Sequence, residues 1–249
     1  MQAGACFPRL EEKFGKPYSI CMATKEALRT PAVEDYSKAI FALESRSEEP
    51  VSTTALAERL GITAGSVSAM LKRLDELGLI SHVPYRGVRL TESGRRIALE
   101  VIRHHRLLES YLAEVLGMPW DRVHAEAEVL EHVLSDDLEA LIDAKLGSPT
   151  IDPHGDPIPS PEYDLQEGET TRLDELPIGA RGRFVRVSDS DPEMLRYLSE
   201  HGIALGEDLE VMERQPFGGP LFVRFGQQTH ALGDGLTRAM RVEWEELPA

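Results

Sequence analysis

Hydrophobic spacing divides the first ninety residues into short helices separated by turn signals. Apolar residues at helical spacing predict a helix over 32–46, directly after the helix-start pair Thr30-Pro31. Two shorter helices are predicted over 55–60 and 64–77, each followed by a glycine, and two short strands are predicted within 79–90. Helix, turn, helix and hairpin in this order predict a winged helix-turn-helix.

Helical spacing continues through the middle of the chain. Three further helices are predicted over 92–116, 121–134 and 136–146. Residues 147–169 are rich in proline and glycine and cannot continue a helix, so we expect an ordered loop that leads into a linker.

Beyond residue 171 the pattern changes to short strands. Four of them are predicted, over 183–187, 209–213, 221–225 and 240–242. A Gly218-Gly219 turn lies among them, and a single helix is predicted over 192–201. This pattern fits a small β-barrel with one helix.

The chain is therefore expected to be an α+β protein of several domains. Residues 1–29 show no clear periodicity and predict a flexible N-terminal extension. The predicted domains are a winged helix-turn-helix (30–97), a helical domain (98–165) and a β-rich C-terminal domain (166–249). The sequence has no apolar run of about 18 residues and no signal-peptide pattern, so we expect a cytoplasmic protein without membrane contact.

Charge is distributed unevenly along the chain. The net charge of −16 argues against nucleic-acid binding, but residues 63–97 contain twice as many basic as acidic residues. Residues 150–249 carry most of the acidic excess. Local charge governs contact with DNA, so a DNA-binding unit remains possible in the winged motif. Both cysteines, Cys6 and Cys21, precede the first predicted helix, which disfavours a cysteine-ligated metal site in the body of the protein.

The second helix of the winged motif has small, hydroxylated residues at its N-terminal end, and this end enters the major groove in such motifs. The candidate DNA-contacting residues of this helix are Thr63, Gly65, Ser66, Ser68, Lys72 and Arg73. On the hairpin, Tyr85, Arg86 and Arg89 can reach the flanking phosphates. A winged helix that serves only protein contacts is the alternative.

The helix predicted over 121–134 carries four potential metal ligands on one face. His124, Glu128, Glu131 and His132 fall within about a quadrant of that face at roughly 100° per residue. An apolar seam runs beside them, formed by Val123, Ala127, Leu130 and Leu134. Two imidazoles and two carboxylates projecting together favour a divalent-metal site over a polar surface with incidental histidines.

Three further residues are candidate ligands. His105 and Glu109 share a face of the preceding helix at i, i+4 spacing, and antiparallel packing of the two helices could bring them to His124. A solvated helix surface is the alternative for this pair. Asp35 lies near the start of the first helix, where it could equally stabilise the helix dipole.

Two other functions fit parts of the sequence. The H-x-x-E-H pattern of zinc proteases is matched at all but one position by Glu128-Val129-Leu130-Glu131-His132. A helical di-metal enzyme, which also binds its metals through Glu and His, is a related alternative. However, the leading His is Glu, and no second Glu-x-x-His motif is present. The β-rich tail could also bind the proline-rich segment 147–161 as an intramolecular clamp.

Several stretches together resemble the diphtheria toxin repressor family of metal-dependent regulators, which includes iron-dependent repressors and manganese transport regulators. The resemblance covers about residues 30–165, and the β-rich tail resembles the family's SH3-like domain more loosely. The stretches are 33–36 (VEDY), the winged helix, 103–109 (RHHRLLE), 119–126 (PWDRVHAE), Glu131-His132 and 152–159 (DPHGDPIP). The resemblance implies a homodimeric repressor of metal-uptake genes that binds an operator on double-stranded DNA, with two metal ions per subunit.

The resemblance also implies how the ligands divide. One site would use His105, Glu109 and His124 with help from the C-terminal domain, for which we select Asp189, Asp191 and Glu193, although the run could instead cap the following helix. The other site would use Asp35, Glu128, Glu131 and His132.

The identity of the ligands bears on the metal. Typical iron-type members have Met and Cys at positions 35 and 128, whereas carboxylates here match the manganese-type members. Oxygen ligands favour a harder ion, so we expect Mn²⁺, with Fe²⁺ or Co²⁺ as alternatives. Small manganese-type members have a Glu at the position of Lys38, where it helps to build a binuclear centre. The lysine therefore puts a binuclear centre in doubt and leaves two separated sites as the alternative.

Overall fold

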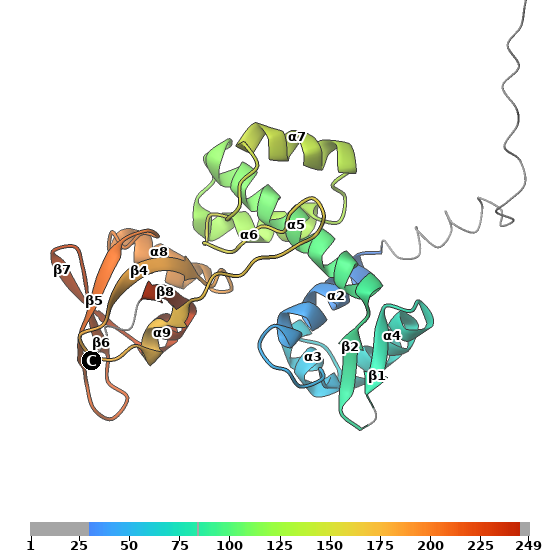
Figure 1. Ribbon diagram of the computed structural model, residues 1–249, viewed down its shortest axis with the longest axis horizontal. Coiled ribbons are helices and arrows are strands. Elements are labelled where there is room, and N and C mark those ends of the chain that lie inside the picture. The colour runs from blue at the N-terminus through green and yellow to red at the C-terminus, as the bar shows by residue number, and fades with distance from the viewer. Residues whose placement is uncertain (1–29, 84, 245–249) are drawn as a thin grey trace, which may run out of the picture.

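A winged helix-turn-helix forms the first folded unit of the computed structural model, which describes residues 30–83 and 85–244 (Figure 1). The predicted N-terminal extension, 1–29, lies outside the described residues. The elements of this unit are α2 (Pro31–Glu44), α3 (Thr53–Leu60), α4 (Ala64–Glu76), β1 (Ile80–Val83) and β2 (Gly87–Leu90). Side-chain oxygens of Ser52 and Thr63 cap α3 and α4.

The wing is fixed to the rest of this unit by a close backbone approach. Strands β1 and β2 pair antiparallel, and Val88 also forms a bridge with Val51 ahead of α3. At Gly87 the backbone has φ +138°, and a Cβ there would lie 2.2 Å from the carbonyl oxygen of Val51. Only glycine can occupy this position without moving the wing.

Three helices form the second unit. They are α5 (Glu92–Glu114), α6 (Trp120–Leu130) and α7 (Asp136–Leu146). Helix α5 joins the two units, because it packs against α2 as well as against α6 and α7 (Figure 1). Leu107, Ala127 and Ile142 lie in the core between the helices of the second unit. No helix among the described residues is long and apolar enough to cross a bilayer.

Helix α6 is shorter than predicted. It ends at Leu130, Glu131 is its C-cap residue, and His132 lies in the turn that follows. Ser135 caps the next helix, so the chain must turn over 131–134 to begin α7. The predicted single face of four ligands is therefore wrong: His124 and Glu128 are helical, whereas Glu131 and His132 are placed by a turn. Leu130 is correspondingly 36% exposed and does not extend the apolar seam.

The C-terminal unit is a six-stranded antiparallel sheet that curls around its own apolar core, with Phe184 and Leu198 fully buried. The strand order is β3-β8-β4-β5-β6-β7. The strands are β3 (Thr171–Arg172), β4 (Arg181–Val187), β5 (Asp208–Arg214), β6 (Leu221–Phe225), β7 (Gln228–Leu232) and β8 (Met240–Trp244).

The sequence prediction missed part of this unit. Strand β7 was not predicted, because its residues are mostly polar and exposed, and neither was the two-residue β3. The predicted helix is α8 (Pro192–Glu200), but the unit also holds α9 (Asp234–Ala239) and the 3₁₀ turn η1 (Leu173–Glu175). The prediction of a single helix is therefore wrong.

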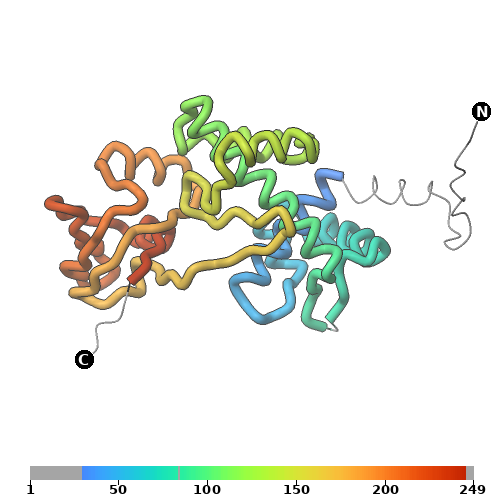
Figure 2. The backbone as a smooth tube through the Cα atoms, turned by 45° about the horizontal axis from the view of Figure 1, so that its top comes forward, coloured from blue at the N-terminus to red at the C-terminus, as the bar shows by residue number. Residues whose placement is uncertain are grey.

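The proline-rich segment after α7 is held between α5 and the barrel. Arg103 Nη1 donates to the carbonyl of Pro159, and Ile158 packs in the core of the helical unit. On the other side, Val187 N of β4 donates to His154 O at 2.9 Å. Figure 2 shows this yellow segment beside the helices before the chain crosses to the barrel. The segment therefore contacts the barrel, as the clamp hypothesis requires, while its other side is bound to α5.

Gly155 makes the contact with the barrel possible. Its backbone has φ +85°, and a Cβ there would lie 2.0 Å from the carbonyl oxygen of Val185 in β4. Arg186 of the same strand forms an ion pair with Asp156. The barrel is thus docked on residues 154–156 by backbone contact, one hydrogen bond and one ion pair.

Candidate metal centre

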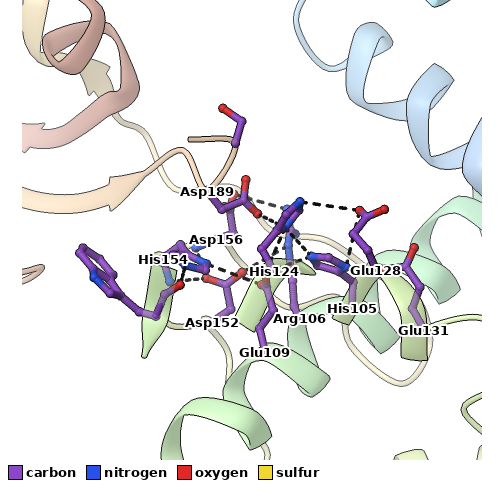
Figure 3. A network of polar contacts seen from close by, with 12 residues as sticks. His105, Arg106, Glu109, His124, Glu128, Glu131, Asp152, His154, Asp156 and Asp189 are labelled. Atoms are coloured by element: carbon purple, nitrogen blue, oxygen red, sulfur yellow. Dashed lines mark hydrogen bonds and ion pairs between the residues drawn. The ribbon is translucent and has the colours of Figure 1, made fainter. Parts of the chain in front are cut away.

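Four of the predicted ligands meet where α5, α6 and the barrel come together, and we name them the buried cluster: His105, Glu109, His124 and Asp189. His105 Nε2 lies 3.0 Å from Glu109 Oε1 and 3.1 Å from His124 Nδ1. Asp189, in the loop after β4, places Oδ2 2.9 Å from His124 Nδ1 (Figure 3). The predicted antiparallel packing of α5 and α6 brings the helical residues together.

Electrostatics in the buried cluster favour a cation. Burial would raise the pKa of Glu109, but hydrogen bonds with His105 and His124 hold it far below its usual range. Hydrogen bonds to Asp189 and Glu109 raise the pKa of His124 to about 10. Without metal, protons therefore supply positive charge that the carboxylates require.

A second group lies between the winged unit and the end of α6, and we name it the interdomain cluster: Asp35, Glu131 and His132. His132 Nε2 lies 3.1 Å from Asp35 Oδ1 and 3.8 Å from Glu131 Oε1. His132 Nδ1 is 2.6 Å from Glu34 Oε2, so Glu34 orients the ring and leaves Nε2 toward the cluster. Burial raises the pKa of Asp35, although the nearby His132 acts in the opposite direction.

Lys38 separates the predicted ligand Glu128 from this cluster. Its Nζ donates to Glu128 Oε1 at 2.8 Å and to Glu131 Oε1 at 2.9 Å. Glu128 is grouped with His105 and Glu131 rather than with Asp35 and His132. The ammonium fills the position between the carboxylates, so the geometry favours two separated sites over a binuclear centre.

His105 connects the two clusters through its two ring nitrogens. Nε2 faces the buried cluster, whereas Nδ1 contacts Glu131 Oε2 of the interdomain cluster. Glu131 is 1% exposed, and its other oxygen faces Lys38 and His132. One imidazole and one carboxylate therefore link the ends of the two clusters.

Sequence reasoning missed a third group next to the buried cluster: Glu109, Asp152 and His154. His154 Nδ1 lies 3.7 Å from Glu109 Oε2. Burial opposes charge on His154, but the facing Glu109 carboxylate outweighs this and raises the pKa of His154 to about 9. Burial, with Asp156 and Glu109 nearby, raises the pKa of Asp152 to about 8. Both residues lie in the 152–159 stretch that carried the family resemblance, but their spacing alone gave no signal for a ligand.

Asp191 and Glu193 do not join any of these groups. Asp191 caps α8 by accepting a hydrogen bond from the backbone N–H of Glu193, and the Glu193 side chain is 88% exposed. Of the three acidic residues in this loop, the structure brings only Asp189 to the buried cluster.

The residues present fit a divalent cation. Both clusters combine imidazole nitrogens with carboxylate oxygens and contain no sulfur, a set that suits Mn²⁺ and other first-row ions. The fully buried Oε2 of Glu109 has no hydrogen-bond donor among the described residues, which is costly unless a cation lies near.

Comparison with known proteins identifies the family. Residues 29–88 match the family described as "Iron dependent repressor, N-terminal DNA binding domain". Residues 91–160 match "Iron dependent repressor, metal binding and dimerisation domain", and residues 171–243 match "FeoA domain". The chain belongs to the iron-dependent repressor family.

Relatives named as iron and as manganese regulators are similar to this family member. The iron-dependent repressor IdeR of Mycobacterium tuberculosis H37Rv is 34% identical over 222 residues, 84% of this chain and 96% of the relative. A solved structure described as "Manganese-dependent transcriptional repressor complex with manganese" is 44% identical with a TM-score of 0.80, covering 86% of this chain and 100% of that one. The structure of the manganese regulator SloR is 30% identical with a TM-score of 0.71, covering 87% and 100%.

Family membership confirms several sequence predictions. The protein is a metal-dependent, DNA-binding transcriptional repressor and not an enzyme. Its partners are an operator on double-stranded DNA and a second copy of the chain. The α+β fold with an SH3-like C-terminal domain is confirmed as well.

In this repressor, α4 exposes most of the residues predicted to contact DNA. Thr63, Gly65, Ser66, Ser68, Lys72 and Arg73 are all exposed. The Thr63 hydroxyl accepts a hydrogen bond from Ser66 N, so part of its hydrogen-bonding capacity is used to cap α4. On the wing, Tyr85 and Arg86 are exposed, whereas Arg89 is half-buried and donates to the carbonyl of Glu48. Arg89 therefore ties the wing to the loop after α2, and it remains a candidate phosphate contact.

Proposed function

We propose that this repressor responds to manganese through two separated metal sites per subunit. One site comprises His105, Glu109, His124 and Asp189, and the other comprises Asp35, Glu131 and His132, with Glu128 at its edge. The single observation that carries the proposal is the contact of His132 with Asp35, 3.1 Å across the boundary between the winged unit and the helical unit. Oxygen and nitrogen ligands without sulfur support Mn²⁺ over softer ions.

The interdomain cluster is built to control how the winged unit is held. Asp35 belongs to α2 of the winged unit, whereas Glu131 and His132 follow α6, and Glu34 keeps the imidazole aimed at Asp35. In the absence of metal, the Lys38 ammonium lies between Glu128 and Glu131 at this boundary and offsets their charge. A bound divalent ion would supply the missing positive charge and join the two units, which selects the DNA-binding state.

Dimer formation then sets the spacing of the two winged units. Exposed apolar side chains gather on α6, α7 and the turn between them, and we propose that they form the dimer interface. They are Val129, Leu130, Val133, Leu138 and Leu141. In the dimer, two α4 helices about 34 Å apart would enter successive major grooves of an operator near metal-uptake genes. A repressor of this kind works on DNA, so we place it in the cytoplasm.

The proposal is tested by measuring operator affinity by fluorescence anisotropy while Mn²⁺, Fe²⁺, Co²⁺ and Zn²⁺ are varied. We expect tight binding with Mn²⁺ and only weak, salt-sensitive binding without metal. Glu131→Ala should abolish the metal response, whereas Glu126→Ala, which removes an exposed carboxylate from the preceding helix α6, should leave it intact. Binding that is equally tight with and without metal, in wild type and Glu131→Ala alike, would contradict the proposal.

Iron is the second candidate, because a relative that is named iron-dependent aligns with 84% of this chain. The double variant Asp35→Met, Glu128→Cys introduces the softer ligands and should shift the response from Mn²⁺ toward Fe²⁺. An unchanged manganese preference in this variant would show that these two positions do not determine selectivity.

A further inference from the structure

Glu109 turns only one of its two carboxylate oxygens toward the buried cluster. Oε1 contacts His105 and His124, whereas Oε2 faces His154 (Figure 3). The Glu109 side chain has no exposed surface, and no described residue donates a hydrogen bond to Oε2. One oxygen of a fully buried carboxylate therefore accepts no hydrogen bond from any described residue and faces only the His154 ring at 3.7 Å.

His154 presents a second buried atom without a partner, directly opposite the first. Its Nε2 lies 2.8 Å from the carbonyl oxygen of Trp120 and must donate, because a carbonyl can only accept. Nδ1 has no hydrogen-bond partner among the described residues, and the raised pKa of His154 means that, without metal, a proton on Nδ1 balances the facing Glu109 carboxylate. Once that proton is released, two atoms that can each bind a cation face each other, so a metal ion can take the place of the proton.

The distance between His154 Nδ1 and Glu109 Oε2 suits a metal ion better than a shared proton. His154 Nδ1 and Glu109 Oε2 are 3.7 Å apart, beyond the range of a hydrogen bond with a shared proton. Two ligand atoms that are each about 2.1 Å from a metal ion, at angles of 90–120°, lie about 3.0–3.6 Å apart. The distance is therefore close to that of two ligands on one ion.

The Asp152 carboxylate lies beside these two atoms and is held in a fixed orientation. Its Oδ1 accepts hydrogen bonds from the backbone N–H of His154 at 2.8 Å and of Asp156 at 2.9 Å. The side chain is buried, and Oδ2 lies 3.8 Å from Arg106 Nε. Ligand atoms of Glu109, Asp152 and His154 all lie within 4.8 Å of one another.

We propose that Glu109, Asp152 and His154 form a further divalent-cation site, which shares the Glu109 carboxylate with the buried cluster. One imidazole and two carboxylates suit Mn²⁺ or Fe²⁺. The carbonyl of His154 accepts the hydrogen bond from Val187 of the barrel, so the ion would fix the segment on which the barrel is docked.

The test compares the number of Mn²⁺ ions bound per chain in full-length wild type and in Asp152→Asn, after dialysis against Mn²⁺ alone. The Asn side-chain oxygen still accepts both backbone hydrogen bonds, so the turn is kept while the charge is lost. We expect three ions in wild type and two in the variant. Asp191→Asn, the same change at a helix cap outside every cluster, should retain three. Equal counts in wild type and Asp152→Asn would overturn the proposal.

Anomalous diffraction at the manganese edge from wild-type crystals provides a measurement that needs no variant. We expect a peak between Glu109 Oε2 and His154 Nδ1. Peaks at the other two clusters without one here would overturn this site alone and would leave the proposed function standing. The absence of manganese from all three clusters would overturn both.

Discussion

At the scale of single residues, helical spacing predicted the ligands that lie within helices. His105 and Glu109 are one turn apart on α5, and the short connection to α6 brings His124 to them. Glu131 and His132 could not be placed by the same argument, because α6 ends before them. Glu34 and His154 were missed, since each acts through a partner far away in the sequence.

Asp189 provides a test of the barrel's part in the buried cluster. Asp189→Asn removes the carboxylate 2.9 Å from His124 Nδ1 and should weaken Mn²⁺ binding at this cluster by about tenfold to 100-fold, the cost typical of losing one supporting ligand. Isothermal titration calorimetry measures the change. Asp191→Asn is the matched control, since Asn caps a helix as well as Asp. Equal losses in both variants would show that the effect is not specific to the cluster.

At the scale of elements, α5 is the central helix against which α2, α6 and α7 pack. Its buried Arg103 ties α7 and the proline-rich segment to it. The sequence predicted this helix and α7 almost residue by residue, because amphipathic spacing and capping residues agree there, whereas it placed the end of α6 four residues too late. The mostly polar strand β7 gave no such pattern and was missed.

Removing the Arg103 side chain should loosen this arrangement. The guanidinium, 3% exposed, is paired with Glu139 at 2.6 Å and with Asp143 at 3.0 Å. Arg103→Ala leaves both carboxylates without that partner and should lower the free energy of unfolding by about 3 kcal/mol in urea titrations. The exposed Arg122→Ala should cost less than about 0.5 kcal/mol. Similar losses in the two variants would contradict the role given to Arg103.

The pH dependence of this loss follows from Glu139. Hydrogen bonds from His104 and Arg103 hold the pKa of Glu139 below its usual value. A lowered pKa in the folded state stabilises the protein above the unfolded pKa, about 4.3, and this stability disappears as the pH falls further. The difference between wild type and Arg103→Ala should therefore be largest near neutral pH and shrink below about pH 4.

At the scale of the whole molecule, the helical unit and the barrel meet at the buried cluster. The barrel brings Asp189 to the cluster because it is docked both on residues 154–156 and, through α8, on α6. The sequence predicted the units and their order, but not how the barrel sits. That position depends on contacts between residues about thirty positions apart, such as Val187 with His154, which no local pattern reveals.

Gly155→Ala tests whether docking of the barrel supports metal binding. A Cβ at this position would meet the carbonyl of Val185 at 2.0 Å, so the barrel must shift and carry Asp189 away. We expect weaker Mn²⁺ binding by about tenfold and a larger radius of gyration in small-angle scattering. Gly179→Ala is the matched control, since that residue has the same φ of +85° with open space around it. A normal radius and affinity in Gly155→Ala would contradict this view of the joint.

His105 has a consequence for how the repressor responds as metal concentration rises. Its Nε2 serves the buried cluster only while Nδ1 carries the proton that Glu131 accepts, and the same Glu131 must be ionised for the interdomain cluster. A metal ion at either cluster thus favours the same state, with the proton on His105 Nδ1 and Glu131 ionised. Because such coupling is reciprocal, metal binding at one cluster strengthens metal binding at the other. Binding of Mn²⁺ should therefore be cooperative within a single subunit, with a Hill coefficient above one. Transcription of the repressed genes would then fall sharply at a threshold concentration of Mn²⁺ rather than decline gradually.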